Sequence, residues 1–309
     1  MSNITPEPDD ILGMRPGGER RTGAAQLLRA GLGLLRHRAL RAWGLAVLTL
    51  ACLFVISQLV FAPLSIGLFV TDGHDFGWWW WHITIIVNIV AIAPFLAAYA
   101  YALLLLLQGR RAGATTLFSP FRSTALWANT MIAGSAALLV HWLVPWLGRR
   151  IPWTELQSGL VDENSLLAKT FRLIPVPEWL IHRLPHWIGI LLAIPLAWSA
   201  LNVLVLGDSG IRAIVRSTRL SLRHWRLAAL YLAAAVLLPL ADWVCVPLAD
   251  LALLNKGIAQ DLIFGLYGLC NLLVSSVILL LESLVLVLIY REFVWREREA
   301  GQTSAALLG

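Results

Sequence analysis

Residues 210–230 read GIRAIVRSTRLSLRHWRLAAL, an arginine-rich segment that leads directly into an apolar span. On a helix, the segment separates an apolar set from a basic set: Ile211, Ile214, Val215, Leu220 and Leu222 against Arg212, Arg216, Arg219 and Arg223. Helices of this kind lie in a membrane interface with their arginines toward lipid phosphates. The pattern therefore predicts an interfacial amphipathic helix over Gly210–Arg226, and a solvated loop is the alternative.

The same unit occurs three times along the chain. Basic segments at Gly23–Arg41, Ala114–Thr124 and Gly210–Arg226 each precede an apolar span that begins near a tryptophan, namely Trp43, Trp127 and Trp225. A second span follows each first span after an outward turn, so the repeats cover residues 23–107, 114–206 and 210–290. We expect an all-α, polytopic membrane protein with six transmembrane helices in three hairpin repeats.

The composition agrees with membrane spans, because 59% of the residues are hydrophobic and only 14% are charged. Soluble domains are about half apolar and about a quarter charged. The predicted spans are Trp43–Phe61, His82–Leu107, Leu126–Leu147, Ile188–Leu206, Leu227–Leu248 and Leu262–Tyr290. Each suffices for a hydrocarbon core of about 30 Å, and their unbroken apolar runs lack the alternation of barrel strands.

The remaining segments are assigned around these spans. Residues 1–22 are rich in Pro, Gly, Asp and Arg and predict a disordered cytoplasmic tail, residues 23–295 form the six-helix domain, and residues 296–309 form a second cytoplasmic tail. Pro94 and Pro195 fall inside the second and fourth spans and are expected to kink them.

Positive charges give the orientation. Eighteen of the 24 Lys and Arg residues lie on the side that carries both termini, so the positive-inside rule places both termini in the cytoplasm. The loop Gly148–His186 has five positive charges on the predicted outer side and opposes the rule.

A net charge of +6 would suggest nucleic acid in a soluble protein, but the sequence contains no nucleic-acid module. Because the arginines flank the spans, anionic lipids are the simpler partner. The expected headgroup contacts are Arg36, Arg41, Arg122, Arg212, Arg216, Arg219 and Arg223.

The segments TTLFSPFRSTALW (residues 115–127) and GIRAIVRSTRLSLRHWRLAAL resemble a loose group of bacterial six-helix integral membrane families of unknown function. That group includes the membrane domain found on some glycerophosphodiester phosphodiesterases. The resemblance covers about residues 23–295. It implies a six-helix fold in the bacterial inner membrane and supplies no catalytic residue.

Glu282 is the strongest single candidate for a functional residue. It lies in VILLLESLVLVL, residues 277–288, roughly 13 Å along the helix from Arg291. An ionisable group at such depth is costly, and it predicts either proton coupling or the binding of a cationic or polar group. We expect the side chain to face the protein interior and to be protonated at neutral pH. The alternative is a structural hydrogen bond to another helix, with Asn202 or an arginine as the candidate partner.

A second candidate group consists of Gln58, His141 and Asp242. Each lies about fifteen residues after the tryptophan of its repeat and four or five residues before a proline. If the repeats pack around a common axis, these side chains approach one another in the outer leaflet, where they could relay protons or bind a polar substrate. Ordinary hydrogen bonds between helices are the alternative.

Other chemistry is not supported by the sequence. His182 and His186 could share a helix face, but Pro185 interrupts it, so we assign no metal site. The three cysteines lie apart in apolar spans and are interpreted as small buried residues. Because the sequence has no P-loop, GxSxG or GxGxxG motif, it assigns no catalytic residue and no cofactor, and an enzyme is the less favoured class.

The leading hypothesis is an inner-membrane protein that is transporter-like or membrane-organising and acts on lipids or small amphiphiles. The alternative is a structural or regulatory membrane subunit that binds a partner membrane protein, or a second copy of itself, through its helices. A polar cavity that reaches Glu282 would favour transport, whereas a solid bundle with an exposed groove of small residues would favour an interaction role.

Overall fold

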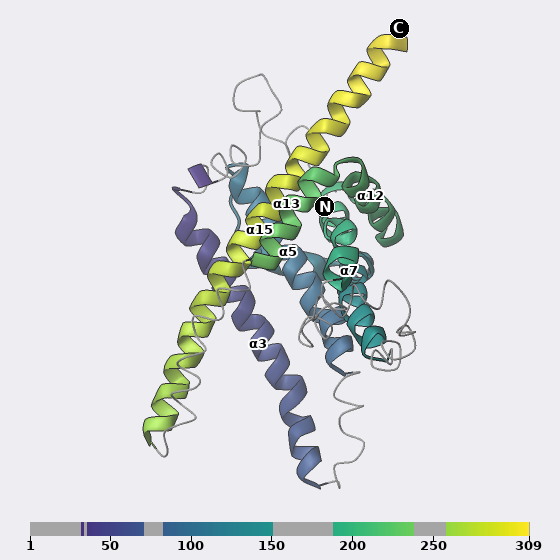
Figure 1. The fold of residues 1–309 in the computed structure, drawn as a ribbon. Helices are drawn as coiled ribbons and strands as arrows, with labels where there is room; N and C mark the ends of the chain where they lie inside the picture. The colour runs from purple at the N-terminus through teal and green to yellow at the C-terminus, as the bar shows by residue number, and fades with distance from the viewer. Residues whose placement is uncertain (1–31, 34–35, 71–82, 151–187, 238–257, 309) are drawn as a thin grey trace, which may run out of the picture.

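The computed structural model describes residues 32–33, 36–70, 83–150, 188–237 and 258–308, and these residues form helices and short turns, without a strand (Figure 1). Four helical stretches are long and apolar enough to cross a membrane: Ala39–Val60, Ile83–Leu107, Ile188–Leu206 and Gly265–Glu297. Within the described residues, the prediction of an all-helical protein with helices that could span a membrane is thereby confirmed.

Two further predicted spans are described only in part. The helix α7, Thr124–Arg150, begins within two residues of the predicted third span, and its described apolar stretch is Thr124–Val140. The helix α13, Trp225–Leu237, covers the first half of the predicted fifth span, whose remainder lies outside the described residues. Six spans and a threefold repeat therefore remain predictions.

The two longest helices cross each other. The helix α3, Ala39–Val70, packs against α15, Ile258–Leu308, and the two diverge on one side of the crossing (Figure 1). At the crossing, Trp43 Nε1 donates a hydrogen bond to Ser276 Oγ over 2.8 Å. With 51 residues, α15 is about 77 Å long, far more than the bilayer core of about 30 Å.

The helix α5, Ala93–Leu107, lies at the centre of the bundle and contacts α3, α7 and α15. Its side chains supply much of the hydrophobic core, together with Trp198, Tyr290 and Phe293, each of which is less than 2% exposed. The Arg38 guanidinium donates hydrogen bonds to the carbonyls of Leu106 and Gly109 at the end of α5. A cation at that position complements the partial negative charge at the C-terminal end of the helix.

Pro94 coincides with a change of helix type. The segment before it, η1 at Asn88–Ile92, is a π-helix, and α5 follows with the proline in its first turn. Because proline has no N–H, it interrupts the regular backbone hydrogen bonds of a helix. Beside this interruption, Trp127 Nε1 of α7 donates a hydrogen bond to the Val90 carbonyl over 3.2 Å. The π-helical turn is thus also held by a donor from a neighbouring helix.

Pro195 has a similar effect on the fourth span. Residues 188–193 are helical, η3 at Ile194–Leu196 is a 3₁₀ turn, and α11 continues over Ser199–Leu206. The carbonyl of Pro195 accepts a hydrogen bond from Ser217 Oγ over 2.7 Å. Ser217 lies on α12, Gly210–Arg223, so the interruption in this span is a docking point for the basic helix.

The basic helix α12 packs against the bundle through small residues. Its buried residues are Gly210, Ala213, Ser217, Leu220 and Ser221. The Gly210 N–H donates to Asn129 Oδ1 over 2.9 Å, and a Cβ at this glycine would lie 2.9 Å from Ile132. Only glycine therefore allows α12 to approach α7 this closely. The basic segment before α7 is shorter and consists of α6, Ala114–Leu117, and the 3₁₀ turn η2, Ser119–Arg122.

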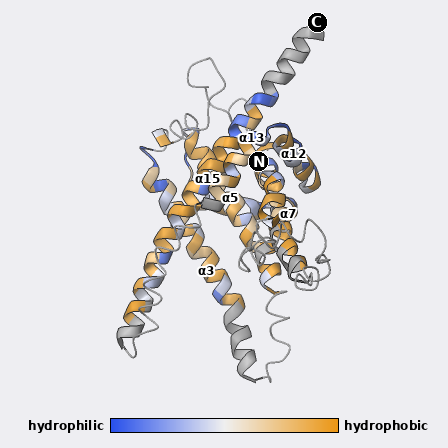
Figure 2. Ribbon diagram, in the orientation of Figure 1, coloured by the Kyte–Doolittle hydropathy of each residue, from blue (hydrophilic) through white to orange (hydrophobic). Residues whose placement is uncertain are grey.

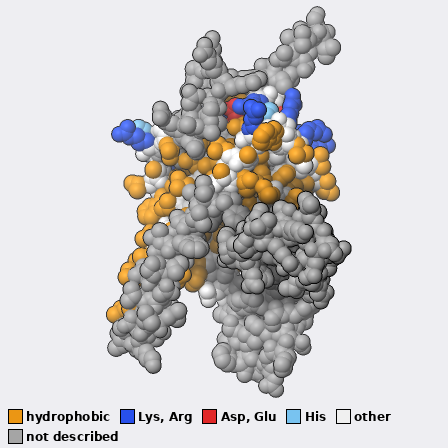
Figure 3. Space-filling model, viewed as in Figure 1, with side chains coloured by type: hydrophobic (Ala, Val, Ile, Leu, Met, Phe, Trp, Pro, Cys, Tyr) orange, Lys and Arg blue, Asp and Glu red, His pale blue; other side chains and the backbone are white. Residues whose placement is uncertain are grey.

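Polar and apolar residues separate along the molecule. Hydrophobic residues dominate the bundle, and hydrophilic residues appear on α12 and on α15 toward its C-terminal end (Figure 2). In the space-filling view, Lys and Arg side chains gather at one level beside α12, above a band of hydrophobic side chains (Figure 3).

Candidate functional site

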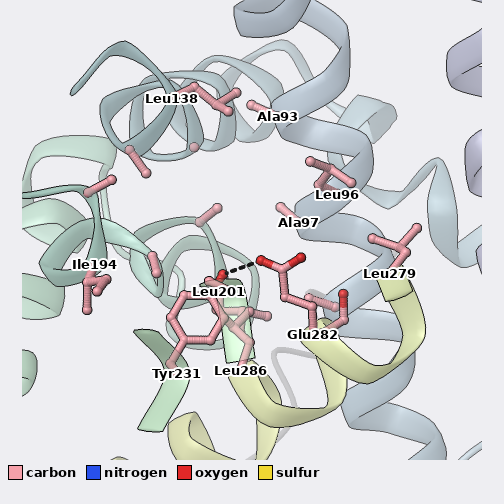
Figure 4. Close-up of a pocket in the computed structure, with 18 of the residues that line it drawn as sticks. Ala93, Leu96, Ala97, Leu138, Ile194, Leu201, Tyr231, Leu279, Glu282 and Leu286 are labelled. Atoms are coloured by element: carbon pink, nitrogen blue, oxygen red, sulfur yellow. Dashed lines mark hydrogen bonds between the residues drawn. The ribbon is translucent and has the colours of Figure 1, made fainter. Parts of the chain in front are cut away.

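A cavity of about 440 Å³ lies among α5, α7, α13, α15 and the stretch Ile188–Leu206. Its size falls within the range of about 300 to 1,000 Å³ that is typical of small-molecule sites. Figure 4 shows side chains from these elements converging on the space.

Alanines create the space. Ala93, Ala97 and Ala100 of α5 line one wall, and Ala193, Ala197 and Ala200 line a second. In each set the spacing is four and then three residues, which on α5 places the members on one helix face. At the edge of the cavity, a Cβ at Gly134 would lie 3.0 Å from the Ala93 Cβ. The helices α5 and α7 therefore meet closely there, while the alanines leave the neighbouring volume empty.

Among the described residues that line the cavity, Tyr231, Glu282 and Ser283 are polar, and the others are Ala, Gly, Leu and Ile. The Tyr231 hydroxyl donates a hydrogen bond to Glu282 Oε1 over 3.1 Å. Tyr231 belongs to α13 and Glu282 to α15, so the bond joins two helices of the cavity wall. A mostly apolar space with one acidic group fits a ligand that has an apolar body and one polar end.

The tyrosine is positioned by a buried tryptophan. The rings of Tyr231 and Trp198 have centroids 5.4 Å apart, and Trp198 is fully buried. Trp198 Nε1 in turn donates to the carbonyl of Leu286 on α15 over 2.9 Å. Because Trp198 contacts both Tyr231 and the helix that carries Glu282, it fixes the distance between the two members of the pair.

The structure places Glu282 in the cavity and separates it from the expected partner Asn202. Asn202 is fully buried, and its Nδ2 donates to the Ala213 carbonyl over 3.2 Å. Asn202 thereby links α11 to α12, and the hydrogen bond to Glu282 comes from Tyr231 instead.

The three polar residues at equivalent repeat positions are not brought together within the described residues. Gln58 is exposed on α3. His141 lies on α7, but its side chain is outside the described part, as is the whole of Asp242. Their shared site remains a prediction.

The predicted headgroup arginines lie at the surface. Six are exposed: Arg36, Arg41, Arg122, Arg212, Arg219 and Arg223. The seventh, Arg216, is half-buried and forms an ion pair with the buried Asp208, at 2.9 Å. Arg216 therefore has a structural partner inside the protein, which the sequence pattern did not predict.

His224 lies at the junction of α12 and α13 and was not predicted as a site residue. Its ring stacks on Phe293 of α15, with centroids 5.6 Å apart. Burial, followed by the positive charges of Arg296 and Arg223, lowers the pKa of His224 from its ordinary value. The junction is therefore built around a neutral imidazole.

Sequence reasoning identified Glu282 but missed Tyr231, Ser283 and the alanines. The two alanine sets with equal spacing are visible in the sequence, as is a tyrosine hydroxyl in an apolar stretch. Small residues at helical spacing occur at many helix contacts, so the pattern alone does not distinguish a cavity from close packing.

No family model, curated protein or solved structure matches the chain. Within the described residues, no three His, Cys, Asp or Glu side chains lie close enough together to hold a metal ion.

Proposed function

We propose that the protein is transporter-like or membrane-organising and binds a lipid or small amphiphile in the alanine-lined cavity. The observation that carries this proposal is the position of Glu282 and Tyr231 at the wall of a mostly apolar cavity, among helices that include three candidate membrane spans. An acyl or alkyl chain would contact the alanine walls, and the polar end would contact the carboxyl group.

The wider architecture belongs to the same proposal. It comprises six spans in three repeats, a bacterial inner membrane and cytoplasmic termini. The arginine level beside α12 (Figure 3) supports only the orientation, because the positive-inside rule assigns an arginine-rich end to the cytoplasm. The same proposal includes a relationship to bacterial six-helix membrane families, among them the membrane domain of some glycerophosphodiester phosphodiesterases.

The faces of α12 support contact with anionic lipids. Besides its buried face, the helix has an exposed apolar face with Ile211, Val215 and Leu222, at 72%, 52% and 66% exposure. The arginines occupy the third face. Such a helix can insert apolar side chains at headgroup depth while its arginines reach phosphates.

Photolabelling tests the cavity. A decyl amphiphile that carries a diazirine should label cavity residues of the purified protein in lipid nanodiscs. Ala235→Leu places extra volume in the cavity, whereas Ala233→Leu changes an exposed position of the same helix. We expect the first substitution to reduce cavity labelling at least fivefold and the second to leave it unchanged. Equal labelling of both variants and the unaltered protein would contradict the proposal.

A second candidate function, a subunit that binds a partner through its helices, is favoured by one surface. Exposed leucines follow one another along α15 at Leu262, Leu266, Leu269 and Leu273. This spacing of four, three and four residues is that of a helix-pairing seam. In a background without the native cysteines, Leu269→Cys should form disulfide-linked dimers in the membrane if this seam pairs two copies. Monomers alone would reject self-association through this face.

A further inference from the structure

We infer that the cavity takes a cationic amphiphile, and that this cation exchanges with a proton on Glu282. The inference rests on the cavity-binding function proposed above and specifies the charge of the ligand. It follows from the charges that surround the carboxyl group, from the direction of that group and from the apolar walls.

Few of the described groups that face Glu282 are polar. From α13 the titratable group is Tyr231, and from α15 the polar neighbour is Ser283. From α5, α7 and the stretch Ile188–Leu206, the described lining residues are Ala, Gly, Leu and Ile. Within the described part of the chain, therefore, no Lys, Arg or His side chain faces the carboxyl group in this cavity.

An ionised Glu282 would have no counter-charge among the described residues that line the cavity. A carboxylate that is removed from water without a counter-charge is strongly unfavourable. The Tyr231 hydroxyl donates a hydrogen bond but carries no positive charge. Glu282 in this cavity must therefore hold a proton or accept a cation from outside the described protein. A ligand that carries the cation meets this requirement, and an anionic ligand does not.

The orientation of the Glu282 carboxyl group also favours a ligand in the cavity. The Glu282 carboxyl group projects into the cavity, and one of its oxygens accepts the hydrogen bond from the Tyr231 hydroxyl (Figure 4). The second oxygen is oriented by that bond for a ligand in the same space.

Exchange follows from the balance of charge. When the cation enters, the carboxylic acid O–H bond breaks, its proton leaves to solvent, and the ammonium group pairs with the carboxylate. One positive charge enters and one leaves. The cavity therefore carries the same net charge before and after binding, so the ligand and the proton compete for one acid.

Three probes with the same chain test the charge preference. Decylamine, decanol and decanoate carry a cationic, a neutral and an anionic head at pH 7. Calorimetry on the protein in nanodiscs, with empty nanodiscs subtracted, gives the affinity of each probe. Repeating the titration in buffers of different ionisation enthalpy counts the protons released.

We expect decylamine to bind at least tenfold more tightly than decanol and to release one proton per molecule bound. While Glu282 is protonated in the empty site, decylamine affinity should fall about tenfold for each pH unit of acidification. Glu282→Gln keeps an acceptor for Tyr231 and should abolish both the proton release and the preference over decanol. Glu297→Gln, which changes an acid outside the cavity, should alter neither.

The two proposals fail in different ways. Equal binding of decylamine and decanol without proton release would overturn the cation inference and leave amphiphile binding intact. Preference for decanoate, or proton release that persists in Glu282→Gln, would also overturn it. If no probe binds the unaltered protein more than the Ala235→Leu variant, the cavity-binding function itself is wrong. If Glu282→Gln does not yield folded protein, two measurements on the unaltered protein still test the inference. These are the number of protons released on binding and the order of affinity of the three probes.

Discussion

At the scale of single residues, the Tyr231–Glu282 pair combines two tasks. The hydrogen bond ties α13 to α15, and it also fixes the carboxyl group at the cavity wall. A tyrosine serves both tasks because its long rigid ring spans the gap and its hydroxyl supplies a donor. Phenylalanine would keep the ring and remove only the donor.

Tyr231→Phe is therefore expected to lower the stability of the protein modestly. A net loss of about 1 kcal/mol is typical when one intramolecular hydrogen bond is removed. Thermal unfolding in detergent should show this loss. In a Glu282→Leu background, which has no acceptor for the Tyr231 hydroxyl, Tyr231→Phe should cause no further loss if the two groups act as a pair. Tyr267→Phe, farther along α15, is the matched control. Additive effects of the two cavity substitutions would contradict a direct coupling.

His224 predicts a dependence of stability on pH. Because its folded pKa is lowered by burial and nearby arginines, the unfolded chain takes up a proton first as the pH falls. Stability is therefore lost from about pH 6.5, the unfolded value, downward to the folded pKa, and is unaffected above this range. His224→Gln should flatten the unfolding temperature between pH 7.5 and 5.5, whereas His37→Gln, at an exposed position, should not. An unchanged pH profile in His224→Gln would contradict this role.

At the scale of elements, α12 differs from the helix that its sequence suggested. The pattern predicted two faces, with Leu220 on the apolar side toward lipid. The structure has three faces, and Leu220 lies on the face that packs against the protein, at 1% exposure. Small residues made this face hard to recognise, because Gly210, Ala213, Ser217 and Ser221 contribute little hydrophobicity, although they set how closely the helix docks.

Gly210→Ala should weaken this docking. The added Cβ would lie 2.9 Å from Ile132 and 3.0 Å from the Asn129 carbonyl oxygen. Overpacking of this kind costs about 1–3 kcal/mol. Gly44→Ala is the control, because nothing lies within 4 Å of a Cβ there and alanine favours the helix. We expect a lower unfolding temperature for the first variant and an equal or higher one for the second. A stabilising Gly210→Ala would show that the close approach is unnecessary.

The exposed faces of α12 should bind anionic membranes. A peptide of residues 210–226 is expected to become helical on anionic vesicles and to bind less tightly as salt increases, with roughly 1 kcal/mol for each arginine near the surface. Circular dichroism and vesicle sedimentation measure both effects. A peptide with Arg212, Arg219 and Arg223 changed to Gln serves as the control. Equal binding to neutral vesicles at every salt concentration would contradict lipid recognition by charge.

At the scale of the whole molecule, the sequence predicts spans better than it predicts their arrangement. Apolar length and the isolated charge of Glu282 are local properties that can be recognised without a fold. The cavity depends on the relative rotation of five helical segments, and no local pattern specifies this rotation. The donation from Trp127 to the Val90 carbonyl is a further example, because it depends on how α7 lies against a proline-interrupted helix.

The proposed topology predicts the labelling of single cysteines. In a background without native cysteines, Ser158→Cys should react only with reagents added from outside the cell, because Gly148–His186 is assigned to the outer side. A cysteine at Gln302 should react only after the membrane is made permeable. Labelling of position 158 from the cytoplasmic side alone would reverse the assignment of this loop.

The uninterrupted length of α15 has a mechanical consequence. Glu282 and Leu308 lie on the same helix, separated by 26 residues or about 39 Å. A tilt of about 5° about Glu282 would displace the far end by about 3 Å, since a straight helix of this length transmits rotation as a rigid rod. The helix α15 can therefore act as a lever. A tilt caused by ligand binding in the cavity would move the C-terminal end of α15 relative to any molecule that contacts it.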